Sequence, residues 1–120
     1  MDGTSNNLHV VLKQISKFDG KNANDFLELN SKLRAGLSIN NRAIFNIMQG
    51  KERPSVTDDS QATARAAWDA ANHDLFNILL FSTGGSTVFV VRRFEGTTLE
   101  DGAGHGQQAW VALREKVKES

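Results

Sequence analysis

The chain has 120 residues, of which 39% are hydrophobic and 23% charged, and this is enough apolar material for one folded domain. Its 14 basic residues balance 14 acidic ones, so no excess of positive charge favours tight binding to nucleic acid or to an anionic membrane surface. It has no cysteine, which excludes disulfides, thiolate catalysis and cysteine-ligated zinc and is typical of a cytosolic protein.

The N-terminal segment gives a mixed signal. Residues 1–7 (MDGTSNN) are polar, show no signal-peptide pattern and are expected to be disordered. Apolar residues between 8 and 15 have helical spacing, but the HVVL stretch within them is rich in β-branched residues. Helix and extended strand both stay open there, and we favour an extended segment. Asp19-Gly20 then predicts a turn.

Two helices are expected next, separated by a polar break. The first runs from 24 to 37, because its apolar residues recur on one helical face: Phe26, Leu29, Leu33 and Leu37. Asn22 or Asn24 is its predicted cap, and residues 38–41 are expected to end it. A short helix then begins after Asn41 and ends at Gly50. Residues 51–56, which include the single proline, predict a surface loop.

The longest predicted helix covers residues 58–83 and is the expected centre of the fold. Its apolar face follows the spacing of an amphipathic helix: Ala64, Ala67, Trp68, Ala71, Leu75, Ile78, Leu79 and, at the end, Ser82. Asp58 and Asp59 suit the positive N-terminal end, and Gly84-Gly85 is expected to stop the helix. Residues 75–81 are apolar almost all round, which predicts burial on nearly every side but is too short to cross a bilayer.

The C-terminal third predicts one short helix and one longer one. The β-branched residues of 86–94 favour a strand by propensity, but a strand there would have no partner except residues 8–12. We therefore predict a short buried helix with Val88, Val91 and Phe94 on its inner face. Residues 96–106 predict a glycine-rich loop, and a last helix follows over 107–118.

No group of residues has the pattern of a catalytic or metal site. Gly102 to Gly106 precede a helix as a phosphate loop would, but they lack the order and the lysine of such loops, and Glu100 and Asp101 would repel an anion. The three histidines have no metal-ligand spacing, and no serine has a nucleophile motif. We therefore predict no enzyme activity, no cofactor and no metal, and we interpret Asp58-Asp59 as capping residues.

Both tryptophans lie in register with apolar stripes, so we interpret Trp68 and Trp110 as core residues rather than stacking platforms. The predicted fold is all-α: one compact bundle of about five helices over residues 1–120, built around the central helix, with a possible extended N-terminal segment. The predicted core combines residues from four of the helices: Leu29, Leu33, Ile44, Trp68, Leu75, Leu79, Trp110 and Leu113.

The order of four elements resembles the capsid region of Gag polyproteins from copia-type LTR retrotransposons. Phe18, Gly20 and Asn22 match an opening F-x-G-x-N element, and an amphipathic helix follows. A short segment ending in a proline loop comes next, then Trp68 with its downstream run through Leu75. The last element is a Trp-x-x-Leu helix, here Trp110 and Leu113. Two positions depart from the family pattern, with Phe26 in place of a tryptophan and Val117 in place of a terminal aromatic residue.

The resemblance implies a structural protein, the N-terminal capsid domain, whose copies associate weakly in isolation and form a cytoplasmic virus-like particle around the element's RNA. RNA would be bound by other parts of the polyprotein, and no membrane is involved. Capsid contacts are expected on the outer helix faces and the proline loop: Glu28, Lys32, Arg34, Lys51 and Arg53.

Two alternatives stay open. One is a host-adopted, Gag-derived module that binds another protein. The other is an RNA-binding module that uses Arg92-Arg93, although two arginines without flanking lysines are more typical of a solvated surface.

Overall fold

The computed structural model describes residue 18, residues 23–96 and residues 104–119. This part of the chain contains five helices and no strands, which confirms the all-α prediction. The helices are α2 (Ala23–Asn40), α3 (Arg42–Met48), α4 (Asp59–Ser82), α5 (Thr87–Arg92) and α6 (Gly106–Glu119). No helix in the described part is long and apolar enough to span a membrane.

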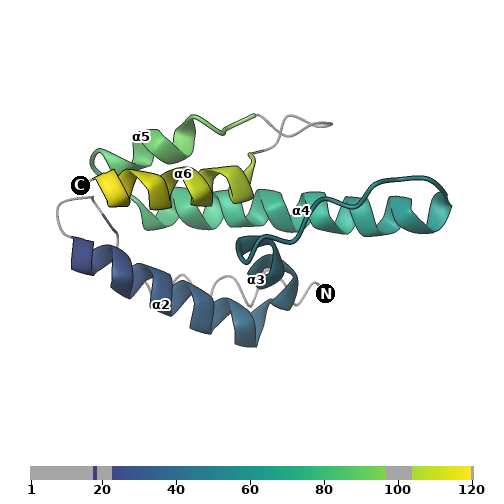
Figure 1. Ribbon diagram of the computed structural model, residues 1–120, viewed down its shortest axis with the longest axis horizontal. Coiled ribbons are helices and arrows are strands. Elements are labelled where there is room, and N and C mark those ends of the chain that lie inside the picture. Colours follow the sequence, from purple (N-terminus) through teal and green to yellow (C-terminus); the bar gives the residue numbers. More distant parts are fainter. Residues whose placement is uncertain (1–17, 19–22, 97–103, 120) are drawn as a thin grey trace.

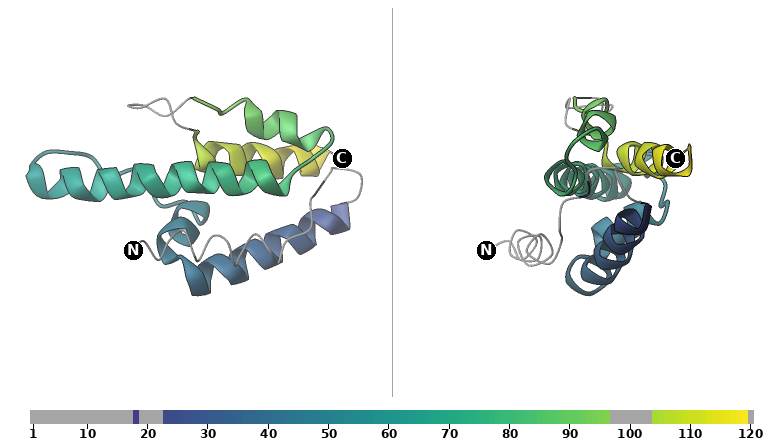
Figure 2. Two further views of the ribbon diagram at one scale, coloured as in Figure 1. Left: turned by 180° about the vertical axis from the view of Figure 1, so that it is seen from behind. Right: turned by 90° about the vertical axis from the view of Figure 1, so that its left-hand side faces the viewer.

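The long helix α4 is the element against which α3, α5 and α6 all pack (Figure 1). Seen end-on, α4, α5 and α6 form one group, and α2 lies to one side of it (Figure 2). The N-terminal half of α4 projects beyond the other helices, and the segment that leads from α3 runs back along it (Figure 1). The expected central helix is therefore present, but only its second half is at the centre of the bundle.

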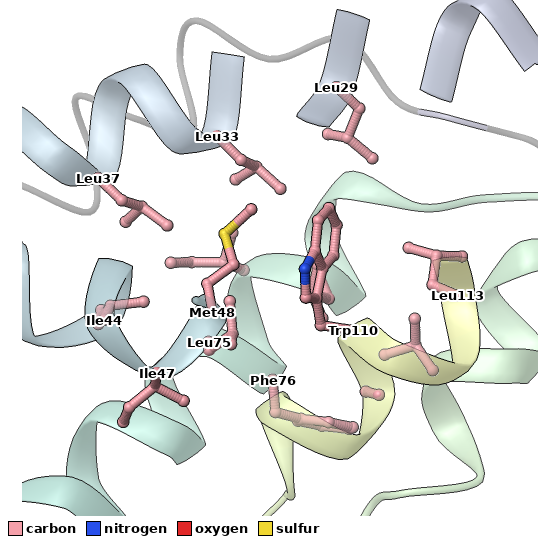
Figure 3. Close-up of a cluster of buried hydrophobic side chains, with 14 of the residues drawn as sticks. Leu29, Leu33, Leu37, Ile44, Ile47, Met48, Leu75, Phe76, Trp110 and Leu113 are labelled. Atoms are coloured by element: carbon pink, nitrogen blue, oxygen red, sulfur yellow. The ribbon is translucent and has the colours of Figure 1, made fainter. Parts of the chain in front are cut away.

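The core lies between α2, α3, α6 and the second half of α4. Leu29, Leu33 and Leu37 of α2 point toward Trp110 and Met48 (Figure 3). Phe26 stacks on the Trp110 ring with centroids 5.6 Å apart, which joins α2 to α6. All eight residues predicted for the core are buried. Burial of large aliphatic and aromatic side chains is the main stabilising contribution here.

The projecting start of α4 is held by a capping box. The Asp58 carboxylate accepts hydrogen bonds from the backbone N–H groups of Ser60 and Gln61, at 3.0 and 3.3 Å. The Gln61 side chain in turn accepts from the Asp58 backbone N–H at 3.1 Å. The Ser60 hydroxyl also donates to this carboxylate, and that bond, followed by the one from the Gln61 N–H, does most to lower the pKa of Asp58. The predicted capping role of Asp58 is confirmed. The capping box stabilises the first turn of α4, which projects beyond the other helices.

The end of α4 differs from the prediction, because no glycine in the left-handed conformation terminates it. Thr83 is extended instead, with φ −118° and ψ 153°. It forms a bridge with Phe18, in which the Phe18 N–H donates to the Ser82 carbonyl and the Gly84 N–H donates to the Phe18 carbonyl, both at 2.8 Å. Gly85, with φ 56°, lies in the following turn. Pairing with a distant residue therefore ends the helix.

The burial of α4 also corrects the predicted stripe. Ala64 and Ala67 are exposed, because none of the other described helices covers that part of α4. At the other end Phe81 is 64% exposed, so the helix is not buried all round. The residues that are buried run from Trp68 to Ser82 and include the polar Asn72.

Two other helices differ in detail from their predictions. Residues 38–40 continue α2 rather than end it, and Asn40 supports this turn by donating from Nδ2 to the Gly36 carbonyl at 2.9 Å. Residues 87–92 are helical, as predicted. Of the predicted inner face, Val91 is buried and Phe94 packs against the core, but Thr87 and Val90 are buried in place of Val88. The Thr87 hydroxyl faces inward and donates to the Phe18 carbonyl at 2.9 Å.

Several predictions fall on residues that the structure does not describe. They include the disorder of 1–7, the open choice at 8–16, the turn and motif positions Gly20 and Asn22, and residues 97–103 of the glycine-rich loop. The end of that loop is described and is not an open surface feature. Gly104 and Gly106 are both buried, and each lies too close to α4 for a side chain.

Candidate interaction surface

The outer face of α2 carries three of the predicted contact residues. Glu28 and Lys32 are both exposed and form an i, i+4 ion pair with 2.9 Å between Nζ and Oε1. Ala35 and Ile39 continue the same row at helical spacing, and Ile39 is 83% exposed. We call these four residues the α2 outer row. It places an exposed charged pair beside a large exposed apolar side chain.

Arg34, the third predicted residue on α2, is exposed and lies near α3. Its guanidinium carbon is 5.9 Å from the centre of the Phe45 ring, and that of Arg42 is 5.6 Å from the same ring. Cations within about 6 Å of an aromatic face are attracted to it. Phe45 therefore holds two guanidinium groups at the junction of α2 and α3.

The proline loop contributes one of its two predicted contact residues. Lys51 has an exposed side chain. Arg53 instead reaches Asp69 of α4 through two hydrogen bonds of 2.8 Å, in the paired geometry that planar guanidinium and carboxylate groups favour. The side chains of this ion pair are only 14% and 18% exposed. Arg53 fastens the loop to α4, so we leave it out of the proposed contact surface.

Large apolar side chains are exposed on several helices and on the loop: Leu27, Ile39, Val56, Phe81, Phe89 and Val111. Phe81 and Phe89, at 64% and 65% exposure, come from consecutive helices, α4 and α5. Single exposed apolar residues are normal, but two phenylalanines and Ile39 at this level of exposure suit a chain that contacts other proteins.

The junction of α4 and α6 contains a buried polar side chain. Asn72 is fully buried, and its Oδ1 accepts from the Gln107 backbone N–H at 2.7 Å. Its Nδ2 lies 3.2 Å from His105 Nδ1. Because the amide nitrogen is a donor, His105 Nδ1 must accept and the ring is neutral, with its proton on Nε2. Asn72 therefore caps α6 from outside its own segment.

The same junction also connects the proline loop to α4 and α6. The Trp68 indole N–H donates to the Lys51 carbonyl at 2.9 Å. Gln107 Nε2 donates to that carbonyl as well, also at 2.9 Å. The Trp68 ring meets the His105 ring edge-on, with centroids 6.1 Å apart. These contacts explain why a tryptophan near the exposed half of α4 is buried.

The pKa of His105 is lowered from its ordinary value of 6.5, chiefly because the ring is partly buried. Its own backbone raises the pKa, the positive charge of Arg53 lowers it, and Asp69 raises it, in decreasing order of effect. Geometry supports the direction, because Nδ1 faces the amide of Asn72 and the Gln108 N–H, which are both donors. A proton on Nδ1 would remove both hydrogen bonds.

We expect the domain to lose stability as the pH falls. A histidine with a folded pKa below its unfolded value binds more protons when unfolded, so the loss begins near the unfolded value of 6.5 and is complete below the folded pKa. Urea unfolding followed between about pH 8 and about pH 5 measures the effect. His105→Asn keeps an acceptor near the Nδ1 position but does not titrate. The free energy of unfolding of this variant should therefore change less with pH. An equal slope in both proteins would contradict the assignment to His105.

The remaining predicted residues lie as follows. The described family-motif residues are all buried and build the fold rather than a contact surface: Phe18, Trp68, Leu75, Trp110 and Leu113. Arg92 and Arg93 are exposed at the end of α5. His73 accepts a hydrogen bond from the Gly104 N–H at 3.2 Å. No group of three or more potential metal ligands occurs within residues 23–96 and 104–119.

Sequence reasoning missed Asn72 and the Arg53–Asp69 pair. Asn72 follows Ala71 on the inner side of α4, and an amide on an otherwise apolar helix face was the available signal. The ion pair left no local signal, because 16 residues separate its members.

The fold and surface define a helical domain with exposed apolar and cationic residues on several faces. Comparisons of this chain with models of protein families, with curated proteins and with solved structures find no match.

Proposed function

We propose that the chain is a capsid domain of a copia-type retrotransposon Gag protein, and that its copies associate into a cytoplasmic particle shell around the element's RNA. The observation that carries the proposal is the exposure of Ile39, Phe81 and Phe89 on three different helices. A shell subunit needs several contact surfaces on one rigid body, because each copy meets more than one neighbour.

The all-α fold and the motif residues support this assignment. The resemblance implies an α-helical domain, and the two motif residues Trp68 and Trp110 are both buried in an all-α bundle. The balanced charge also suits association between identical copies, since like-charged subunits would repel each other. A host-adopted module that binds another protein would use the same surfaces and is the second candidate.

We expect the α2 outer row to take part in assembly. Lys32→Glu should weaken particle formation while the free energy of unfolding falls by no more than about 1 kcal/mol, because exposed i, i+4 pairs contribute only tenths of a kcal/mol. Electron microscopy of particles and sedimentation over a range of protein concentrations measure assembly. Urea unfolding of the same variant measures stability.

The control exchanges the two charges. Glu28→Lys with Lys32→Glu restores an ion pair on α2 but leaves a negative charge at position 32 and a positive one at 28. Failure of both variants to assemble assigns the effect to the surface, whereas rescue by the exchange assigns it to α2 stability. Normal particles from variants on every exposed helix face would rule out shell formation as the role of this domain.

An RNA-binding role is the third candidate, and Arg92 and Arg93 are available for it at the surface. Filter binding over a range of salt concentrations separates it from the first two. Phosphate contacts release counterions, so RNA binding through these arginines would weaken steeply as salt rises and would be lost in Arg92→Gln with Arg93→Gln. The capsid proposal predicts no such binding by this domain alone.

A further inference from the structure

A cavity of about 290 Å³ opens where α2, α3 and α6 meet. Its walls are Asn30 and Arg34 from α2, Met48 and Gln49 from the end of α3, and Trp110 and Arg114 from α6. Trp110 is also a central residue of the core (Figure 3). The cavity therefore has a rigid inner wall and a polar rim supplied by three different elements.

The polar groups of this cavity make no hydrogen bond or ion pair with any residue in the described part of the chain. This holds for the amides of Asn30 and Gln49 and for the guanidinium of Arg114, and Arg34 has only its contact with Phe45. Some charged groups elsewhere in the domain are paired instead, as Arg53 is with Asp69 and Lys32 with Glu28. Four polar side chains without a hydrogen bond or ion pair to the described residues therefore surround one cavity.

The indole N–H of Trp110 is a further donor at this cavity. The Trp110 residue is only 2% exposed, and a tryptophan N–H at the edge of a core usually has a hydrogen-bond partner. Trp68 follows that rule by donating to the Lys51 carbonyl. Trp110 N–H has no such acceptor among the described residues, and its nitrogen lies on the edge of the ring turned toward Met48, which lines the same cavity (Figure 3).

Charge and donor geometry limit what the cavity could hold. Among the described residues, two guanidinium groups line it and no carboxylate does, so this lining carries a net positive charge. Guanidinium groups on different helices suit a compact group with several negative oxygens, and planar N–H pairs match phosphate oxygens well. A stacked base is disfavoured, because the Trp110 ring already stacks on Phe26. The donors fit a phosphate group rather than an aromatic ligand.

We propose that this cavity is a binding site for a phosphate group, either free or esterified, held between Arg34 and Arg114 and reached by the Trp110 N–H. The site is independent of the proposed shell function, because it rests on the donors that line it and not on any contact between copies. It also gives a role to Arg34, which is not part of the α2 outer row.

The test follows the two indole N–H resonances of ¹⁵N-labelled protein during titration with inorganic phosphate or pyrophosphate, against potassium chloride at equal ionic strength. We expect a saturable shift of the Trp110 resonance and none of Trp68, whose N–H is already bonded. Arg34→Gln and Arg114→Gln should each weaken binding by roughly tenfold or more, since a charge-assisted hydrogen bond carries at least that factor. Arg92→Gln on α5 is the matched control and should bind normally.

Each remaining outcome decides the matter. A shift that does not saturate, or that survives both cavity variants, overturns the proposal. An equal response to acetate also overturns it, because the site would then be unselective among anions. A short single-stranded oligonucleotide serves as the esterified source, and a response to it alone would assign the phosphate to nucleic acid. Both cavity arginines are exposed, so circular dichroism should show unchanged helix content, and Arg114→Lys should retain part of the binding.

Discussion

Trp68→Ala should lower the free energy of unfolding by about 3–5 kcal/mol, the usual cost of deleting a buried tryptophan. Trp68 is 6% exposed, and it connects α4 to the proline loop through the Lys51 carbonyl and to the start of α6 through His105. Its removal leaves a void at the point where three segments meet. Urea unfolding monitored by circular dichroism measures the change. Fluorescence is less suitable, because the variant keeps only Trp110 and its signal would differ from that of the parent protein.

Trp68→Phe separates packing from hydrogen bonding. It keeps an aromatic ring but loses the N–H, and the Lys51 carbonyl still accepts from Gln107. We expect it to cost about 1 kcal/mol for the hydrogen bond, plus a smaller term for lost volume. If Trp68→Phe were as destabilising as Trp68→Ala, the hydrogen bond rather than packing would be the dominant contribution.

Gly106→Ala should be about as damaging, with a loss of about 3 kcal/mol or more. A Cβ at this position would overlap the backbone carbonyl oxygen of Asn72 and approach the backbone nitrogen of Phe76. These are main-chain atoms of α4, so no side-chain rotation relieves the overlap. The helix α6 would have to move away from α4, and the hydrogen bond from Gln107 to Asn72 would be lost with it. Thermal unfolding measures the result.

Gly50→Ala is the control for this substitution. Gly50 has φ +109° but open space around it, so alanine there adds backbone strain without a clash. That strain costs about 1–2 kcal/mol. If Gly106→Ala were no more destabilising than Gly50→Ala, the close packing of α6 on α4 would not be a requirement of the fold.

The sequence by itself determined the helical class of this protein and the place of most of its helices. Apolar spacing of three and four residues identified the leucine face of α2 and the tryptophan face of α6, because that spacing is imposed by the helix itself. Local capping was readable for the same reason. Asp58 and Asn41 accept hydrogen bonds from N–H groups only two or three residues away.

Tertiary structure alone decided which positions of a regular apolar pattern are buried and which distant residues end or cap the helices. Ala64 and Ala67 continue the apolar face of α4 into a region that none of the helices in residues 23–96 and 104–119 covers, so they are exposed. Phe18 ends α4 from outside that helix, and Asn72 caps α6 across 35 residues of sequence. The cavity lined by Arg34 and Arg114 also depends on how three helices meet. Periodicity reports only the neighbours along one helix, whereas these features depend on which distant segments pack together.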